Sequence, residues 1–234
     1  MPTTLTTTWR MVAGAFWIVV AATGAASCGK SSSDSTTAPT TTSGLSFFVT
    51  SAKSTTGNIG GLRGADALCQ SLAQAAGAGS RTWRAYLSVE SDPDNSNRPT
   101  DARSRIGNGP WVNAKGVTVA ASLADLHART GDATVFVDEK GQPINGQWAG
   151  SPAPVEHDIM TGSNADGTLL AGFTCENWTS ASATARGQVG HSDGLGPGGS
   201  AAGALSSWNS AHSNTNCANT APGGGAGRIY CFAR

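Results

Sequence analysis

The stretch GFTCENWTSASATARGQVGHSDG, residues 172–194, places a cysteine beside an acidic and aromatic cluster and continues through small and polar residues. It holds too few large apolar side chains to bury a core of its own. We therefore expect a cross-link through Cys175 to hold the segment, with Trp178 packed beside it and Glu176 solvated or bonded to nearby backbone. The partner of Cys175 decides the fold.

Four of the five cysteines fall in the part of the chain that is expected to fold: Cys69, Cys175, Cys217 and Cys231. An even number of cysteines in an exported domain predicts two disulfides, for which three pairings are possible. Their spacing contains no C-x₂₋₄-C pair, which argues against a zinc site built on thiolates. Export also argues against a catalytic thiol, because that chemistry needs a free cysteine.

Two flanking segments indicate where two of these cysteines point. Apolar residues recur at intervals of three and four in residues 61–79, which predicts a helix with Cys69 on its buried face. The alternation in RIYCFAR predicts a strand over 228–233 with Cys231 on one face. A bridge between the two would join both ends of the domain and leave the other pair to close an inner loop.

The N-terminus has the pattern of an export signal. Residues 1–27 contain an apolar run from Met11 to Gly24 that is short for a membrane span and typical of a signal peptide. Ala25-Ala26-Ser27-Cys28 resembles the lipobox of bacterial lipoproteins, which implies that Cys28 becomes an acylated, palmitate-bearing N-terminus. The alternative is an ordinary cleavage site with Cys28 as a bystander. Gly29 after it favours the outer membrane as the destination of the lipoprotein.

Composition divides the remainder into a tether and one domain. Residues 28–44 are mostly Ser, Thr, Ala, Pro and Gly and cannot offset the entropy of ordering, so they are expected to form a tether. Residues 45–234 fit one domain. Fifteen basic residues face fifteen acidic ones in the whole chain, so no basic surface is expected for nucleic acid.

The domain reads as α+β with long loops. Strands are expected at 45–51, 81–89 and 134–137, and a helix at 122–131 with Ser122 as its N-cap. A polar loop is expected after residue 89, and a Gly- and Ser-rich loop from Gly187 to the terminal strand. The order of these elements lacks the βαβ rhythm of a parallel sheet.

Several stretches together resemble endostatin, a domain of the C-type-lectin-like fold. The similarity covers about residues 45–234, and its stretches are TWRAYLS (82–88), SLADLH (122–127), VFVDEKGQPI (135–144), residues 160–190 and RIYCF (228–232). The resemblance implies a C-type-lectin-like, endostatin-like fold with two nested disulfides, Cys69–Cys231 and Cys175–Cys217. Bacterial lipoproteins with endostatin-like domains form a known group, and some bind extracellular-matrix or plasma proteins.

Departures from the resemblance restrict what it implies about ligands. The Pro-flanked triplets of calcium-dependent lectins are absent, and Trp208-Asn209 is followed by Ser210. Endostatin binds zinc through histidines at its extreme N-terminus, where this domain has none, so no zinc site is carried over. Its heparin affinity depends on arginine clusters, whereas here acidic residues interleave with the basic ones: Asp92, Asp94, Asp101, Arg98, Arg103 and Arg105.

Three other groups of residues are candidates for metal binding or catalysis. Residues 92–101 have the oxygen density of a calcium loop, but an EF-hand needs Gly and Glu where this chain has Asn97 and Arg103. The run Gly223-Gly224-Gly225 is read as a flexible turn. Metal ligation or acid–base chemistry is an alternative role for Glu156, His157, Asp158, His191 and Asp193. The histidines are spread through the expected loops without a paired spacing, so we expect them to be surface residues.

We accordingly expect a non-catalytic binding module with no catalytic residue, cofactor or metal. It would be anchored in the bacterial envelope by lipid and would contact an extracellular protein or glycan through loops, with Trp111 and Trp148 as candidate contact residues. The alternatives are an envelope hydrolase that uses Glu156, His157 or Asp158, and a structural lipoprotein without a specific ligand.

Overall fold

The computed structural model describes residues 1, 3, 8 and 44–234. Nearly all of the expected signal peptide, the lipid site at Cys28 and nearly all of the tether lie outside the described residues. Within the described part of the chain, no helix combines the length and the apolar character needed to cross a membrane. Residues 44–234 belong to one compact unit.

A six-stranded sheet runs through the domain, and the terminal strand β10 (Gly225–Ala233) is its organising member. One half of β10 pairs antiparallel with β1 (Phe47–Val49) and β2 (Trp83–Ala85). The other half pairs parallel with β7 (Asp158–Met160). The sheet continues antiparallel from β7 to β8 (Gln188–His191) and β9 (His212–Ser213).

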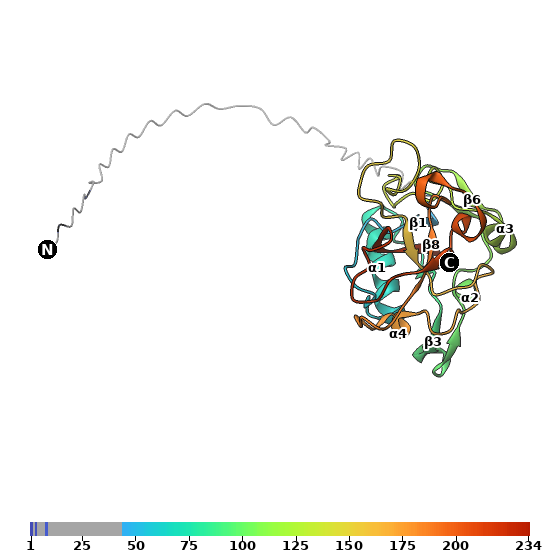
Figure 1. The fold of residues 1–234 in the computed structure, drawn as a ribbon, viewed down its shortest axis with the longest axis horizontal. Coiled ribbons are helices and arrows are strands. Elements are labelled where there is room, and N and C mark those ends of the chain that lie inside the picture. The colour runs from blue at the N-terminus through green and yellow to red at the C-terminus, as the bar shows by residue number, and fades with distance from the viewer. Residues whose placement is uncertain (2, 4–7, 9–43) are drawn as a thin grey trace, which may run out of the picture. The chain divides into compact units, whose positions relative to one another are not determined.

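Short elements surround this sheet, as Figure 1 shows. Among the described helices, α1 (Gly61–Ala75) is the longest. Two ribbons form from β3 (Val89–Asp92) with β4 (Arg98–Thr100), and from β5 (Trp111–Val112) with β6 (Thr118–Ala120). The remaining turns of helix are α2 (Ala102–Arg105), α3 (Leu123–Ala128), α4 (Cys175–Trp178), η1 (Pro93–Asn95), η2 (Pro197–Gly199) and η3 (Gly203–Ser206). The architecture is α+β with few helices and small sheets.

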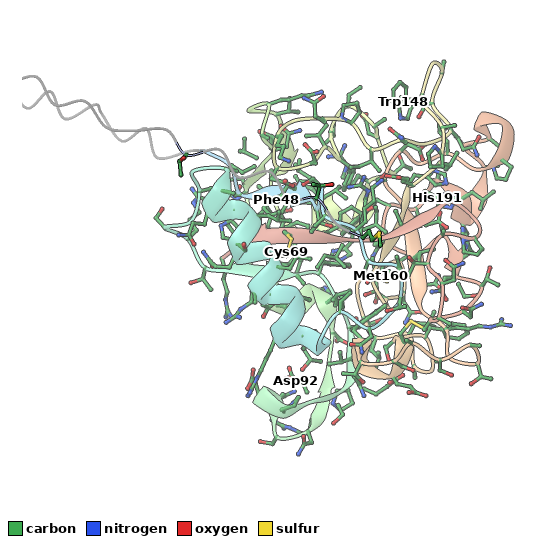
Figure 2. All side chains as sticks on the ribbon, turned by 90° about the vertical axis from the view of Figure 1, so that its left-hand side faces the viewer. Phe48, Cys69, Asp92, Trp148, Met160 and His191 are labelled. Carbon is green, nitrogen blue, oxygen red and sulfur yellow. A yellow bond between two sulfur atoms is a disulfide. The ribbon has the colours of Figure 1, made fainter. Side chains whose placement is uncertain are left out.

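Two disulfides are present, Cys69–Cys231 and Cys175–Cys217, which confirms the expected cross-links. The first joins α1 to β10, and Cys69 is fully buried on the face of α1 that packs against the sheet (Figure 2). The second closes the loop that carries β8 and β9. The two bridges therefore secure different parts of the sheet.

The hydrophobic core lies on both sides of β10. Alternate residues of this strand face a cluster with α1 and an aromatic cluster, as the sequence pattern predicted. Cys231 packs with Cys69 and Trp83 on the first side. Tyr230 and Phe232 pack on the second, with Phe47, Trp111, Phe136 and Trp208.

The sequence misplaced several elements. The strand expected over 81–89 is divided, because after Ala85 the chain turns away and the N–H of Ser88 donates to Thr161 O instead. The strand expected at 134–137 is reduced to isolated bridges. The polar loop after residue 89 is in part the β3–β4 hairpin. The helix capped by Ser122 is confirmed, with the Ser122 hydroxyl accepting from Asp125 N–H, but it ends at Ala128.

The loop expected after Gly187 is the largest error, since β8 and β9 lie within it. Small and polar residues form β8 because backbone approaches it closely. A Cβ added at Gly190 would stand 1.9 Å from the carbonyl oxygen of Trp208. A strand buried by such a contact shows no apolar alternation, so its sequence resembles a loop.

Candidate functional site

The turn at the centre of the quoted stretch has an unusual backbone. Cys175, Glu176, Asn177 and Trp178 all have positive φ, from 46° to 63°. Left-handed helical backbone costs about 1–2 kcal/mol per residue for side chains other than glycine. The turn is thus strained and requires strong local contacts.

Those contacts come from the disulfide and from two side chains. The Asn177 Oδ1 accepts from the N–H groups of Glu90 and Ser91, at 2.8 and 3.0 Å. The indole of Trp178 is fully buried and donates to Ser88 O at 2.8 Å. The expected packing of Trp178 near the bridge is confirmed, and the strain was not visible in the sequence.

A cleft of about 320 Å³ lies between this turn and the start of α1. Its wall is largely apolar, and a few polar groups reach it. Arg63 stands at its edge in an exposed ion pair with Asp94. The lining residues are Gly60, Gly61, Leu62, Arg63, Val89, Ser91, Asp92, Pro93, Asn177 and Thr179. Its size and mixed lining are typical of small-ligand sites.

A second site is a cluster of three histidines and one aspartate, which we call the histidine cluster: His157, Asp158, His191 and His212. The sheet brings them together. Asp158 on β7 lies directly opposite His191 on β8, so their side chains share a face. His212 on β9 is opposite Val189, two residues before His191 and on the same face. His157 immediately precedes β7.

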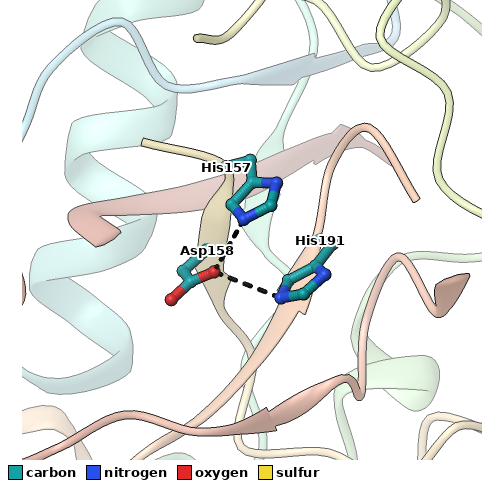
Figure 3. Close-up of side chains that lie close together, drawn as sticks. All are labelled: His157, Asp158 and His191. Atoms are coloured by element: carbon teal, nitrogen blue, oxygen red, sulfur yellow. Dashed lines mark ion pairs between the residues drawn. The ribbon is translucent and has the colours of Figure 1, made fainter. Parts of the chain in front are cut away.

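The three imidazoles face the same oxygen atom. Asp158 Oδ1 is 3.4 Å from Nε2 of His157, 3.3 Å from Nε2 of His191 and 3.6 Å from Nε2 of His212. Figure 3 shows the first two of these contacts. Asp158, His157 and His191 are almost completely buried, whereas the His212 side chain is 34% exposed. Reading the histidines as surface residues in loops is therefore wrong for His157 and His191.

The other ring nitrogen of each imidazole also has a partner. Nδ1 lies 2.7 Å from Asp193 Oδ1 in His157, 2.9 Å from Leu205 O in His191 and 3.0 Å from Ser213 O in His212. These acceptors favour a proton on Nδ1, which leaves Nε2 of a neutral ring with a free lone pair.

Burial and charge act in opposite directions on Asp158. Burial raises the pKa of its carboxyl, but the neighbouring His191 and His212 outweigh that effect, so the pKa lies below its usual value. The Asp158 carboxylate in turn raises the pKa of His212 against the effect of burial. The carboxyl is accordingly held in its ionised form, as a metal ligand or an ion-pair partner requires.

Glu156 has a different environment, although it is adjacent in sequence. Its carboxylate binds Lys53 and, at 2.6 Å, the guanidinium of Arg228. Burial raises the pKa of Glu156, but these two cations outweigh it and lower the pKa. Glu156 is thus a neutralised structural carboxylate and makes a poor proton donor near neutral pH.

The two candidate tryptophans differ in exposure. Trp111 is 1% exposed and packs edge-on against Phe232, with ring centroids 5.3 Å apart, so the expectation of a surface contact there is corrected. It is buried because it packs in the aromatic cluster with Tyr230 and Phe232 of β10. Trp148 is half-buried on a long loop and donates to Ile144 O (Figure 2).

The expected acidic loop at 92–101 is a capped turn. Asp92 accepts from Asp94 N–H and from the Thr100 hydroxyl, so both its carboxylate oxygens serve the turn. Arg105, which is close to Arg98 and Arg103 in sequence, forms an ion pair with Asp66. Arg105 is thus largely buried, whereas Arg98 is exposed and bonds Asn95.

The fold and the site together define a disulfide-linked α+β domain with a buried histidine and aspartate cluster. Residues 52–194 match the family described as "Protein of unknown function (DUF1554)", and because this covers more than half of the chain, the chain belongs to that family. The match includes His157, Asp158 and His191 and ends before His212. No curated protein matches the chain.

Proposed function

We propose that this chain is a non-catalytic binding module with an endostatin-like, C-type-lectin-like fold, exported as a lipoprotein through Cys28 and bound to a protein or glycan ligand outside the cell. The observation that carries the proposal is the pair of disulfides, which join α1 to β10 and close the inner loop as the resemblance to endostatin implies. Long loops held by few cross-links suit recognition of a ligand by surface shape.

The ligand surface that we propose is the cleft between α1 and the left-handed turn. Strained backbone gathers at functional sites, and Asn177 contributes both to the turn and to the lining of the cleft. The hydrolase alternative is less favoured because Glu156 is already neutralised by Lys53 and Arg228.

Screening the purified chain against arrays of matrix proteins and glycans tests the proposal. Thr179 lines the cleft and is exposed, so Thr179→Trp should fill the cleft and weaken binding at least about tenfold. Thr118→Trp, at an exposed position on β6, is the matched control and should bind as the parent does. An array without any ligand would overturn the binding function.

A second variant separates the cleft from the loop of Trp148. If Trp148→Ala abolishes binding while Thr179→Trp leaves it intact, the ligand contacts the Trp148 loop and the cleft assignment is wrong.

The lipid anchor needs its own measurement. Mass spectrometry of the protein extracted from bacterial membranes should find an N-terminal peptide that begins at an acylated Cys28. An unmodified N-terminus at another residue would contradict the anchor.

A further inference from the structure

Asp158 differs from the other buried carboxylates of the described residues. Within residues 44–234, neither of its oxygens has a hydrogen-bond partner, and His191 Nε2 also lacks one. An unsatisfied buried polar atom costs about 1–3 kcal/mol, and more when it is charged. The other buried carboxylates all accept hydrogen bonds: Asp66, Asp92, Asp138, Glu139, Glu156 and Asp193.

The distances from Asp158 Oδ1 to the three imidazoles match those in the coordination shell of a metal ion, and His212 has to move closer to the other donors to complete that shell. With bonds of about 2.0–2.2 Å, the ligand atoms of a tetrahedral zinc ion lie about 3.3–3.6 Å apart. The distances from Asp158 Oδ1 to the three Nε2 atoms are 3.4, 3.3 and 3.6 Å. Donor atoms of His157, Asp158 and His191 all lie within 4.8 Å of one another.

The surroundings of the cluster also suit metal ligands. Metal-binding imidazoles commonly donate their second N–H to a carboxylate or a carbonyl, as the Nδ1 atoms of His157, His191 and His212 can do here. Gly224 has φ of 115°, and a Cβ there would lie 3.3 Å from His157 Nε2. The glycine run before β10, read from sequence as a flexible turn, thus keeps the space beside His157 free of side chains.

One rearrangement accompanies binding. The rings of His157 and His191 are stacked, with centroids 4.2 Å apart and planes 13° apart. Each Nε2 lone pair lies in the plane of its ring, so two nearly parallel rings cannot direct both lone pairs at one ion, and one imidazole has to turn relative to the other. A divalent cation would then compensate the buried negative charge of Asp158.

We propose that His157, Asp158, His191 and His212 bind one divalent transition-metal ion of the zinc class. Nitrogen and carboxylate donors in a buried site favour zinc over calcium or magnesium, which prefer oxygen ligands. Four protein ligands fill a tetrahedral shell, so the ion is structural and joins β7, β8 and the two-residue edge strand β9. The proposal is independent of the cleft and its ligand.

Zinc binding to the chelator-treated protein, with both disulfides intact, tests the site. Equilibrium dialysis with metal analysis should find one zinc per chain, and zinc should raise the melting temperature. Asp158→Asn keeps the shape of the side chain and should abolish stoichiometric binding. His127→Gln is the matched control, because His127 lies outside the cluster and bonds Tyr86 and Leu123 instead.

Two further variants keep the test decisive if Asp158→Asn folds poorly. His212→Asn alters the half-exposed ligand on an edge strand and should weaken zinc binding while the protein stays folded. Asp193→Asn removes the carboxylate that positions His157 and should weaken it about 10–100-fold. Cobalt should give the intense visible absorption of a tetrahedral ion in the parent protein and lose it in these variants.

Two results would overturn the proposal. A folded parent protein that binds no zinc at micromolar concentration has no such site. Binding that survives both Asp158→Asn and His212→Asn, or that His127→Gln removes, places the ion elsewhere.

Discussion

Asp66 and Asp158 are both buried aspartates beside the same sheet, but their partners differ. Asp66 on α1 receives the guanidinium groups of Arg84 and Arg105 at 2.7 and 2.8 Å and the N–H of Ala85 at 2.9 Å. Asp158 on β7 faces three imidazoles at 3.3–3.6 Å and, among the described residues, accepts no hydrogen bond.

The difference shows how two buried charges are balanced. Arginine is always protonated, so Arg84 and Arg105 supply the positive charge that compensates the carboxylate of Asp66. Neutral imidazoles supply lone pairs and no charge, so the balance at Asp158 depends on a proton or a metal ion. Residues of the chain balance the charge of Asp66, whereas the proposed metal ion would balance the charge of Asp158.

The two disulfides give the largest expected effects on stability, and the inner one also bears on the histidine cluster. It closes the segment from Cys175 to Cys217, which carries His191 and His212, with a sequence separation of 42. Replacing both cysteines with alanine should destabilise the protein by about 4 kcal/mol on the loop-entropy relation and also weaken zinc binding. Urea unfolding and zinc titration measure the two effects.

The outer disulfide is the control for that experiment. Its separation of 162 residues predicts a loss of about 5 kcal/mol on the same relation. Its removal should affect zinc binding less, because the inner bridge still closes the segment that carries His191 and His212. If both pairs changed zinc affinity equally, the inner loop would have no special role in holding the cluster.

The same substitution at the two aspartates should have opposite dependence on metal. Asp66→Asn leaves Arg105 buried without its partner, so it should cost about 3 kcal/mol whether or not zinc is present. Asp158→Asn removes an unsatisfied buried charge, so it should not destabilise the metal-free protein, and it should abolish the stabilisation by zinc. Urea unfolding with and without chelator gives both numbers.

A large loss of stability for metal-free Asp158→Asn would show that the imidazoles alone satisfy this carboxylate. The contrast with Asp66 would then disappear.

The left-handed turn allows a smaller test of the region around α1. Glu176 is exposed and has φ of 54°, so glycine would relieve strain there. Glu176→Gly should raise stability by up to about 1 kcal/mol. Asn177→Gly is the matched change, and it should destabilise the protein because it removes the acceptor for Glu90 and Ser91. Equal effects of the two variants would mean that Asn177 does not hold the turn.

The smallest expected effect concerns the histidine outside the cluster. Burial lowers the pKa of His127 from 6.5, so the folded protein takes up this proton less readily than the unfolded chain. The stability that depends on neutral His127 is present above about pH 6.5 and is lost as the pH falls through that value. The metal-free His127→Gln variant should therefore lose less stability than the parent between pH 7 and pH 5.5. Parallel stability curves for the two proteins would contradict this.

The predictions that the structure confirms came from sequence patterns within single elements. The helical stripe around Cys69 and the alternation around Cys231 follow from side-chain periodicity within one element, and the Ser122 cap needs three neighbouring residues. The cysteine count and the resemblance to endostatin supplied the two cross-links. Each of these signals lies within a short window or in the number of one residue type.

The sequence by itself determined an α+β domain with two disulfides and an alternating last strand that carries Cys231 on one face. Only the tertiary structure decided that His191 and His212 meet Asp158 and its neighbour His157. Their meeting depends on the register between β7, β8 and β9, and no short-range signal encodes it. Because β8 is buried by backbone passing over Gly190, its residues did not need the apolar alternation by which a buried strand is recognised.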